Sequence, residues 1–309
     1  MGGSGRQRGV ALITAVLVVA LAAVAAAAMT TRQTVDVRRA ANVMDADQAW
    51  LYLLGAEAWA AQVLRRDLKD NRTDSFEDDW ALVLPAQTVE GGAVSGAIVD
   101  LQGRFNLNNL VRGNKVDALA LERFRRLLAV LGLAPELAAA VVDWLDENEE
   151  PLVDGGAEDG LYLGLQPPHR AGNGPMYSAS ELLRVHGVTP AIYAKLAPYV
   201  FAARPVTAIN VNTAPAPVLR ALAADISEEA VKKLLERRKD KPWNTVAEFL
   251  QEEALAGTGI QAEGLAVASS HFLVQAEATV GRLTRRLNAV LYRPADGKVR
   301  TVLRSHGAW

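Results

Sequence analysis

The 309-residue sequence contains no cysteine and has almost no net charge. The absence of cysteine excludes disulfide bonds, thiolate metal sites and a cysteine nucleophile. The formal net charge of −2 excludes a global basic field of the kind that attracts nucleic acid. No G-x-x-x-x-G-K-S/T motif occurs, so the chain has no P-loop for a nucleotide. Outside one segment, the sequence also lacks any apolar run long enough to cross a bilayer.

That segment runs for 20 residues from Val10 to Met29, with Thr14 as its one polar side chain. A helix of this length spans about 30 Å, which matches the hydrocarbon core of a bilayer. Arg6 and Arg8 precede it, and the positive-inside rule leaves this end in the cytoplasm. Two interpretations stay open on these residues alone. One is a secretory signal peptide that is removed, and the other is a retained single-pass anchor.

The helical pattern continues beyond the apolar run. No proline occurs between Thr30 and Lys69, and apolar residues recur at spacings of three and four, which gives the segment one apolar face. We expect one helix from Val10 to Leu68, about 90 Å long, whose last third packs on a globular domain. The alternative is a membrane helix followed by a separate amphipathic helix.

The rest of the chain alternates between strand and helix patterns. A strand is predicted over 94–101, helices over 117–131 and 135–145, and two pairs of short helices between 178 and 250. Three alternating segments after residue 270 predict strands. This order predicts an α+β fold, in which a helical block is inserted into a small domain with a sheet.

An acidic stretch at residues 143–159 contains eight carboxylates and no lysine or arginine. Such charges repel one another unless they are solvated or neutralised. Oxygen ligands without histidine or cysteine favour calcium. Asp146, Asn148 and Glu150 have the spacing of the first three ligands of an EF-hand, but the later positions do not fit that motif.

Three interpretations of the acidic stretch therefore remain. It could be a solvated loop, or a different calcium loop in which Glu158 and Asp159 return to Asp143 and Asp146. A carboxylate pair for glycoside hydrolysis is the third, but nothing else in the sequence suggests a sugar-binding cleft. A metal-dependent hydrolase also lacks support, since no Ser/His/Asp arrangement is recognisable.

The segment 209–250 resembles the helix-hairpin-helix units of competence-type DNA receptors. In those units a glycine-containing hairpin presents backbone N–H groups to phosphates, but the hairpin here is AADIS (223–227), without glycine. The first pair of helices keeps only Gly187. A basic cluster nearby is flanked by acidic residues, and its members are Lys232, Lys233, Arg237, Arg238, Lys239 and Lys241. We favour packing or docking modules, and a periplasmic DNA-binding protein of competence-receptor type is the alternative.

Several stretches together resemble the K-type minor pseudopilins of type II secretion systems, the general secretion pathway protein K family, over almost the whole chain. They are RQRG/VALIT (6–14), GRFNLNNLV (103–111), DWLDENEEP (143–151), GGAEDGLY (155–162), SASELLRVHGV (178–188) and INVNTAPAPVL (209–219). The resemblance implies that a prepilin peptidase cuts between Gly9 and Val10 and that the new amino group is methylated. The apolar helix is then retained as an anchor.

The resemblance also explains Thr14. Most pilin-like proteins have glutamate at this fifth mature position, where it is thought to pair with the amino group of the subunit above. A subunit with none above can lack it, which suits the tip of a filament.

The fold that the resemblance implies is pilin-like. A long N-terminal helix, anchored in the membrane, packs on a small antiparallel sheet that is interrupted by a large helical domain with helix-hairpin-helix or SAM-like units. The expected units are a leader (1–9), the transmembrane and spine helix (10–68), the first part of the core (69–104), the inserted domain with the acidic loop (105–204), a second helix-hairpin-helix-like unit (205–265) and the C-terminal strands (266–309).

The family binds calcium in the acidic loop, and this favours the calcium interpretation, with one or two ions. The ligands expected by position are Asp143, Asp146, Glu158 and Asp159. Asn148 stands where relatives often have aspartate, and it can still donate an oxygen.

The function that the resemblance implies is assembly rather than catalysis. The expected partners are the I- and J-type minor pseudopilins, the major pseudopilin, the prepilin peptidase and the inner-membrane assembly platform, with no nucleic acid and no small-molecule substrate. The chain would cross the bacterial inner membrane once, with its bulk in the periplasm, and reach the pseudopilus tip after assembly. From there it would initiate a pseudopilus that helps to export folded proteins.

Overall fold

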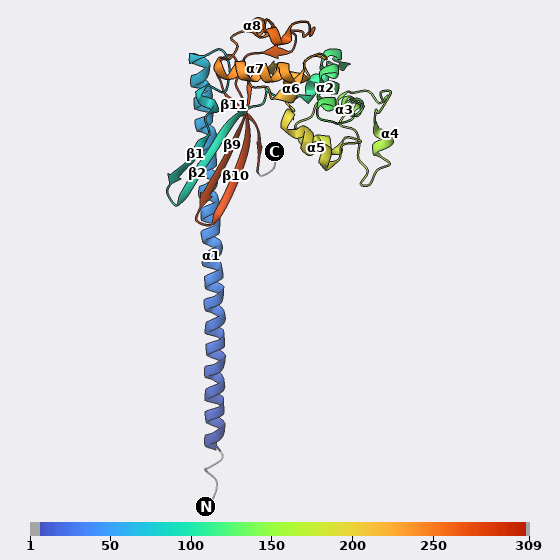
Figure 1. The fold of residues 1–309 in the computed structure, drawn as a ribbon. Helices are drawn as coiled ribbons and strands as arrows, with labels where there is room; N and C mark the ends of the chain where they lie inside the picture. The colour runs from blue at the N-terminus through green and yellow to red at the C-terminus, as the bar shows by residue number, and fades with distance from the viewer. Residues whose placement is uncertain (1–6, 307–309) are drawn as a thin grey trace, which may run out of the picture.

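One helix dominates the computed structural model, which describes residues 7–306. Helix α1 (Gln7–Asp70) has 64 residues and is about 96 Å long. Residues 9–44 are all exposed, and this part of the helix projects from the rest of the molecule (Figure 1). The predicted single helix is confirmed, and the alternative of two separate helices is wrong. Of the predicted leader, residues 1–6 lie outside the described range.

The far end of α1 packs on a five-stranded antiparallel sheet with the order β1-β2-β9-β10-β11. The strands are β1 (Leu84–Val89), β2 (Gly92–Asp100), β9 (His271–Val280), β10 (Leu283–Tyr292) and β11 (Arg300–Ser305). Between helix and sheet lies a core that includes Leu53, Leu64, Trp80, Phe272 and Leu287. A long helix on a small antiparallel sheet confirms the predicted pilin-like architecture.

A helical domain is inserted between β2 and β9, the two central neighbours of the sheet. Its longer helices are α2 (Ala118–Val130), α3 (Leu137–Leu145) and α7 (Glu228–Asp240). Its shorter helices are α4 (Asp159–Tyr162), α5 (Pro190–Leu196), α6 (Ala216–Arg220) and α8 (Val246–Leu250). Within residues 7–306 there are five 3-10 helices: η1 (Asp79–Ala81), η2 (Leu107–Leu110), η3 (Ala179–Arg184), η4 (Ala197–Tyr199) and η5 (Glu253–Leu255).

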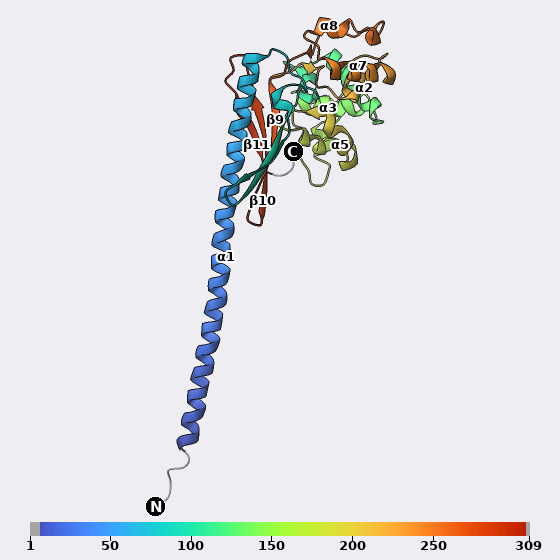
Figure 2. The ribbon, with the colours of Figure 1, turned by 60° about the vertical axis from the view of Figure 1, so that its left-hand side comes forward.

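Short two-residue strands complete this domain. They are β3 (Phe105–Asn106), β4 (Val111–Arg112), β5 (Lys115–Val116), β6 (Val200–Phe201), β7 (Ile209–Asn210) and β8 (Leu265–Ala266). The pairs β3–β6 and β7–β8 are parallel. One hydrophobic core extends from Phe105 to Leu265, so the segments 105–204 and 205–265 share their buried side chains. The domain lies beside the end of the sheet that is farther from the projecting helix (Figure 2).

Side-chain caps explain where several of the short helices begin. Ser178 and Glu181 form a capping box at η3, Thr189 accepts from the backbone of Ile192 at α5, and Ser227 accepts from Ala230 at α7. The first predicted helix pair thus consists of the 3-10 helix η3 and the helix α5. The turn between them contains Gly187, whose φ of +79° suits glycine.

A buried polar network joins the inserted domain to the sheet. Asp100, at the end of β2, accepts hydrogen bonds from Asn210 (3.0 Å), Thr213 (2.5 Å) and Ser269 (2.7 Å). Burial raises the pKa of Asp100, and these hydrogen bonds oppose the rise. Because the partners come from the inserted domain and from the return to β9, Asp100 fixes the junction between the two parts.

A second buried group lies beside this junction. Arg293, just after β10, contacts Asp67 of α1 at 2.5 Å and Asp74 at 2.6 Å, and all three side chains are buried. Arg293 thus ties the end of the long helix to the C-terminal strands. Removing one member of such a pair leaves the other charge buried without a partner, which is strongly destabilising.

Candidate metal centre

The acidic loop is anchored to α3 by Asp143. This carboxylate is fully buried and accepts hydrogen bonds from the backbone N–H groups of Leu152 (3.0 Å) and Ala157 (2.8 Å). Burial raises the pKa of Asp143, and the two N–H donors oppose the rise. Asp143 therefore folds the loop back onto the helix that precedes it.

A glycine pair makes this return possible. A Cβ atom at Gly156 would lie 2.4 Å from Asp143 Oδ2 and 2.3 Å from the carbonyl oxygen of Leu152. Gly155 has a φ of +113°, which side chains other than glycine rarely adopt. The GG pair thus allows the loop backbone to approach the carboxylate closely.

Two more carboxylates are buried beside Asp143. Asp146, which caps α3, is 3% exposed, and Glu158, which precedes α4, is 5% exposed. Among the residues that the structure describes, Asp146 Oδ1 and both carboxylate oxygens of Glu158 have no hydrogen-bond partner. Buried oxygens of this kind require a proton or a cation.

The charges of several neighbouring carboxylates act on Glu158. Its pKa is raised to about 7, first by burial and then by repulsion from Asp143, Asp146, Asp159 and Glu149. Burial, and next the charge of Asp143, also raises the pKa of Asp146. Asp143, Asp146 and Glu158 therefore form one group of buried, mutually repelling carboxylates, which we call the carboxylate cluster.

The other two predicted ligands lie beside this cluster: a hydrogen bond from the Asn148 side chain opposes the rise in the pKa of Asp146, and the charge of Asp159 adds to the rise in the pKa of Glu158. Asn148 is exposed, and its side-chain oxygen accepts from the backbone N–H of Glu150 at 2.8 Å. One oxygen of Asp159 accepts from the N–H of Ala171 at 2.9 Å, and the other lies 3.6 Å from Arg170. Each side chain already has a partner of its own.

No group of three or more histidine, cysteine, aspartate or glutamate side chains between residues 7 and 306 is arranged to hold a metal ion. At least one side chain of the loop would have to turn for an ion to be enclosed. The calcium site and its ligands stay a prediction. Glu149 was not among the predicted ligands, although its charge acts on Glu158 and its place in the same acidic run was visible in the sequence.

The predicted processing site and Thr14 lie on the exposed part of α1. Gly9 and Val10 are helical and exposed, and nothing lies within 4 Å of a Cβ placed on Gly9. The Thr14 hydroxyl donates to the carbonyl oxygens of Val10 (3.1 Å) and Ala11 (3.0 Å). Its hydrogen bond is therefore made within its own helix, and Thr14 needs no polar partner in lipid.

Two arginines of the basic cluster near α7 make contacts within the protein, whereas its four lysines are exposed. Arg237 pairs with Glu248 and Glu252, each at 3.1 Å. Arg238 donates to the carbonyl oxygens of Val211 (3.0 Å) and Ala214 (2.8 Å), in the NVNTA segment. These two guanidinium groups therefore join α7 to α8 and to the NVNTA segment.

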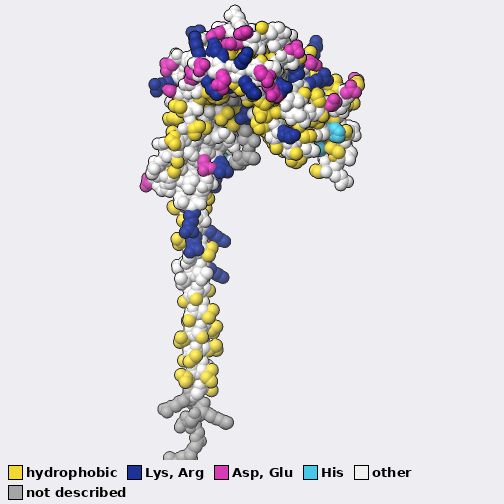
Figure 3. Space-filling view, viewed as in Figure 1, with side chains coloured by type: hydrophobic (Ala, Val, Ile, Leu, Met, Phe, Trp, Pro, Cys, Tyr) yellow, Lys and Arg dark blue, Asp and Glu magenta, His cyan; other side chains and the backbone are white. Residues whose placement is uncertain are grey.

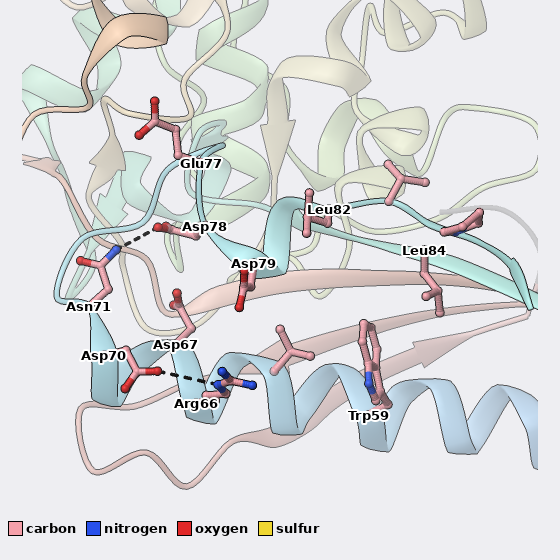
Figure 4. Close-up of a pocket in the computed structure, with 13 residues that line it drawn as sticks. Trp59, Arg66, Asp67, Asp70, Asn71, Glu77, Asp78, Asp79, Leu82 and Leu84 are labelled. Atoms are coloured by element: carbon pink, nitrogen blue, oxygen red, sulfur yellow. Dashed lines mark hydrogen bonds and ion pairs between the residues drawn. The ribbon is translucent and has the colours of Figure 1, made fainter.

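A groove of about 690 Å³ lies between the end of α1 and residues 77–85. Figure 4 shows Trp59 and Leu84 at one end and Asp70 at the other. The 13 residues that line it include no histidine, cysteine, serine or threonine. The groove therefore has an apolar half and an acidic half, but no nucleophile paired with a base.

Comparison with known proteins agrees across sequence and structure. Two family models, both described as type II secretion system (T2SS), protein K, match residues 103–205 and 209–268. The chain is 36% identical to the type II secretion system protein K of Pseudomonas aeruginosa, over 97% of this chain and 93% of the relative. The protein of the same name from Klebsiella pneumoniae is 35% identical, over 93% of each chain.

A solved structure shares the fold. The GspK-GspI-GspJ complex from the type 2 secretion system of enterotoxigenic Escherichia coli contains a chain that matches with a TM-score of 0.80 and 25% sequence identity. The match covers 88% of the present chain and 100% of that chain. The similarity thus includes the sheet and the inserted helical domain, and is not confined to the long helix.

Proposed function

Because this chain belongs to the type II secretion system protein K family and is a minor pseudopilin, we propose that it forms the tip of the pseudopilus together with I- and J-type partners. From the tip it initiates assembly of the filament, which supports export of folded periplasmic proteins across the outer membrane. The anchor stays in the inner membrane until assembly, and the sheet and the helical domain lie in the periplasm. The chain acts by assembly and catalyses no reaction.

The observation that carries this proposal is the match to the GspK-GspI-GspJ complex over the full length of that chain. Two features of the present chain support it. The inserted domain projects sideways from the sheet (Figure 2), so it would clash with neighbours inside a filament shaft but not at the end. The Thr14 hydroxyl bonds within its own helix, so this position is compatible with a subunit that has no neighbour above it.

Co-expression with the I- and J-type proteins of the same secretion system tests the partnership. We expect a complex with one copy of each chain, measured by size-exclusion chromatography with light scattering. In the original host, loss of the present chain should leave exported proteins in the periplasm, and the wild-type chain should restore secretion. Failure to form a complex with either partner would contradict the proposed role.

We also propose that the carboxylate cluster and its loop bind calcium. The support is chemical: three buried carboxylates repel one another, and three of their oxygens have no partner among the described residues. Hard oxygen ligands of this kind suit calcium. Asp143, Asp146 and Glu158 would hold the ion. Asp159 and Asn148 would join only after leaving their present partners. The ion would neutralise the cluster and tie the loop to α3.

Thermal unfolding of the full-length protein with and without calcium tests this site. Calcium at a hundredfold excess over its dissociation constant should add about 2.7 kcal/mol to the free energy of unfolding. The double variant Asp146→Asn, Glu158→Gln should lose this gain. Glu147→Gln is the matched control, because Glu147 is an exposed carboxylate of the same loop that does not perturb the cluster. An equal response to calcium in all three proteins would rule out the cluster as the site.

A further inference from the structure

Three arginines lie on one side of α1 beyond the end of the apolar run. Arg32, Arg38 and Arg39, which we call the arginine collar, lie between Met29 and the globular part of the molecule, and Figure 3 shows them as the basic patch on the exposed helix. The whole segment is exposed. Within the described range, the collar has one carboxylate contact, between Arg39 and Asp36 at 4.0 Å, and both side chains are more than 70% exposed.

Arg32 lies at the height of the lipid headgroups, and Arg38 and Arg39 lie just beyond them. If residues 10–29 fill the hydrocarbon core, Arg32 lies about 5 Å beyond it and Arg38 and Arg39 about 14 Å beyond it, while the headgroup layer is about 5–8 Å thick on each side. Side chains of a helix lean toward its N-terminus, which here is the direction of the membrane. Long arginine side chains can therefore reach back to the headgroups.

Neither membrane topology nor the fold accounts for the collar. Positively charged residues favour the cytoplasmic side of a span, whereas the collar lies on the opposite side from Arg6 and Arg8. Along α1, contacts with the sheet begin only near Asp45, which lies beside Gly281, and Gln48, which donates to the carbonyl oxygen of Glu90. The single contact with Asp36 is too exposed to neutralise three guanidinium groups.

We propose that the arginine collar binds the phosphate groups of anionic phospholipids in the leaflet from which the globular part emerges. Guanidinium groups bind phosphate oxygens in a two-point geometry, which lysine cannot reproduce. Thr30 and Thr31, just before the collar, and Thr34, within it, donate to carbonyl oxygens one turn earlier, at 2.9 to 3.0 Å, so this polar stretch is compatible with the interface. The inference rests on the proposed retention of the anchor.

Bound lipid would fix the depth at which the anchor helix lies in the bilayer. It would also oppose extraction of the subunit, because the phosphates must be released before the helix enters a filament. Protein carboxylates of a neighbouring subunit could then replace them. The collar thus makes extraction of the subunit from the membrane depend on which lipids surround it.

Energy transfer to labelled lipids tests the proposal directly. Because the chain contains no cysteine, a Thr34→Cys variant carries one fluorophore at the collar. The full-length protein is placed in phosphatidylcholine vesicles with a trace of acyl-labelled phosphatidylglycerol or acyl-labelled phosphatidylcholine. We expect phosphatidylglycerol to be enriched around the label, by about fivefold for each arginine that reaches the headgroups, and to lose this enrichment as salt is raised.

Three variants make the result specific. Changing the collar to Arg32→Gln, Arg38→Gln and Arg39→Gln should abolish the enrichment, and lysine at all three positions should restore part of it. Arg66→Gln is the matched control, because Arg66 is equally exposed but lies at the far end of α1. Equal energy transfer from both lipids in the wild type, or enrichment that survives in the triple glutamine variant, would overturn the proposal. If the anchor itself were not retained in the bilayer, neither lipid would transfer energy at all, so the two failures are distinguishable.

Discussion

At the scale of single residues, the molecule contains buried carboxylates that need a counter-charge. Arg293 supplies one to Asp67 and Asp74, whereas no cation among the described residues faces the cluster at Asp146 and Glu158. This contrast makes the metal-free cluster a source of instability that depends on pH. The packing of the cluster also depends on the conformation of the loop backbone around it.

We expect Glu158 to make the metal-free protein less stable as the pH rises. Its pKa is raised from 4.5 to about 7 in the folded state, so folding favours the protonated carboxyl. The penalty of the charged form therefore develops as the pH rises from about 4.5 through 7 and persists above it. The free energy of unfolding, measured by urea titration without calcium, should fall by about 3 kcal/mol across this range.

Glu158→Gln should flatten this pH dependence, because glutamine does not ionise. Calcium should flatten it too, by neutralising the cluster at high pH. A stability profile that rises with pH in the metal-free wild type would contradict the assigned burial and repulsion at Glu158.

Gly156→Ala should disrupt the loop, because its Cβ would lie 2.4 Å from Asp143 Oδ2 and 2.3 Å from the Leu152 carbonyl oxygen. We expect a loss of about 2 kcal/mol in the free energy of unfolding, typical of overpacking. Gly160→Ala is the control, since nothing lies within 4 Å of a Cβ at that position in α4. Similar thermal unfolding of the two variants would show that the loop backbone does not need the glycine.

At the scale of elements, the end of α1 is held to the C-terminal strands by the buried Arg293 pairs. Arg293→Gln leaves Asp67 and Asp74 buried without a counter-charge, and the expected cost is about 3–5 kcal/mol. The control is Arg286→Gln, because the Arg286–Glu277 pair is exposed and worth less than about 1 kcal/mol. Denaturant titration of the full-length chain measures both.

Asp67→Asn should cost less than Arg293→Gln. Burial raises the pKa of Asp67 to about 6, although its hydrogen bond to Arg293 opposes the rise. The charged form of Asp67 is thus already disfavoured in the folded state. In the Asp67→Asn variant, Arg293 also keeps Asp74 as a partner. The opposite order of stabilities would show that Asp67, rather than Asp74, is the main counter-charge.

The sequence patterns predicted the elements with strong periodicity. The long helix, α2, α3 and the three C-terminal strands were predicted, because an amphipathic or alternating pattern extends over each of them. β1 was missed: four of its six residues are exposed, and Pro85 interrupts it, so it shows no alternation. The two-residue parallel pairs were missed as well, because they are too short for a pattern and depend on tertiary contacts.

The candidate site was predictable in composition but not in geometry. The acidic run identified Asp143, Asp146 and Glu158, which the structure brings together. It did not show that the side-chain oxygens of Asn148 and Asp159 accept hydrogen bonds from backbone N–H groups of Glu150 and Ala171. The Arg293 pairs could not be predicted either, because their partners lie more than 200 residues away in the sequence.

At the scale of the whole molecule, the chain combines an exposed apolar anchor with a globular part at the other end of one helix (Figure 1). Transmission of force from the anchor to the sheet requires a continuous helix, because a hinge between them would absorb the movement. Residues 9–44 are all exposed, so in the proposed role their surfaces would be available to lipid first and to other subunits later. Retention of the anchor is therefore the premise of both the filament role and the arginine collar.

The mass of the mature protein, isolated from its own membrane, tests this premise most directly. We predict a chain that begins at Val10 with a methylated amino group, because a prepilin peptidase removes the leader after Gly9. Such a protein keeps the apolar helix and can enter a pseudopilus. A mature chain that begins near Met29 would contradict the account, since ordinary signal-peptide cleavage would release a protein without an anchor.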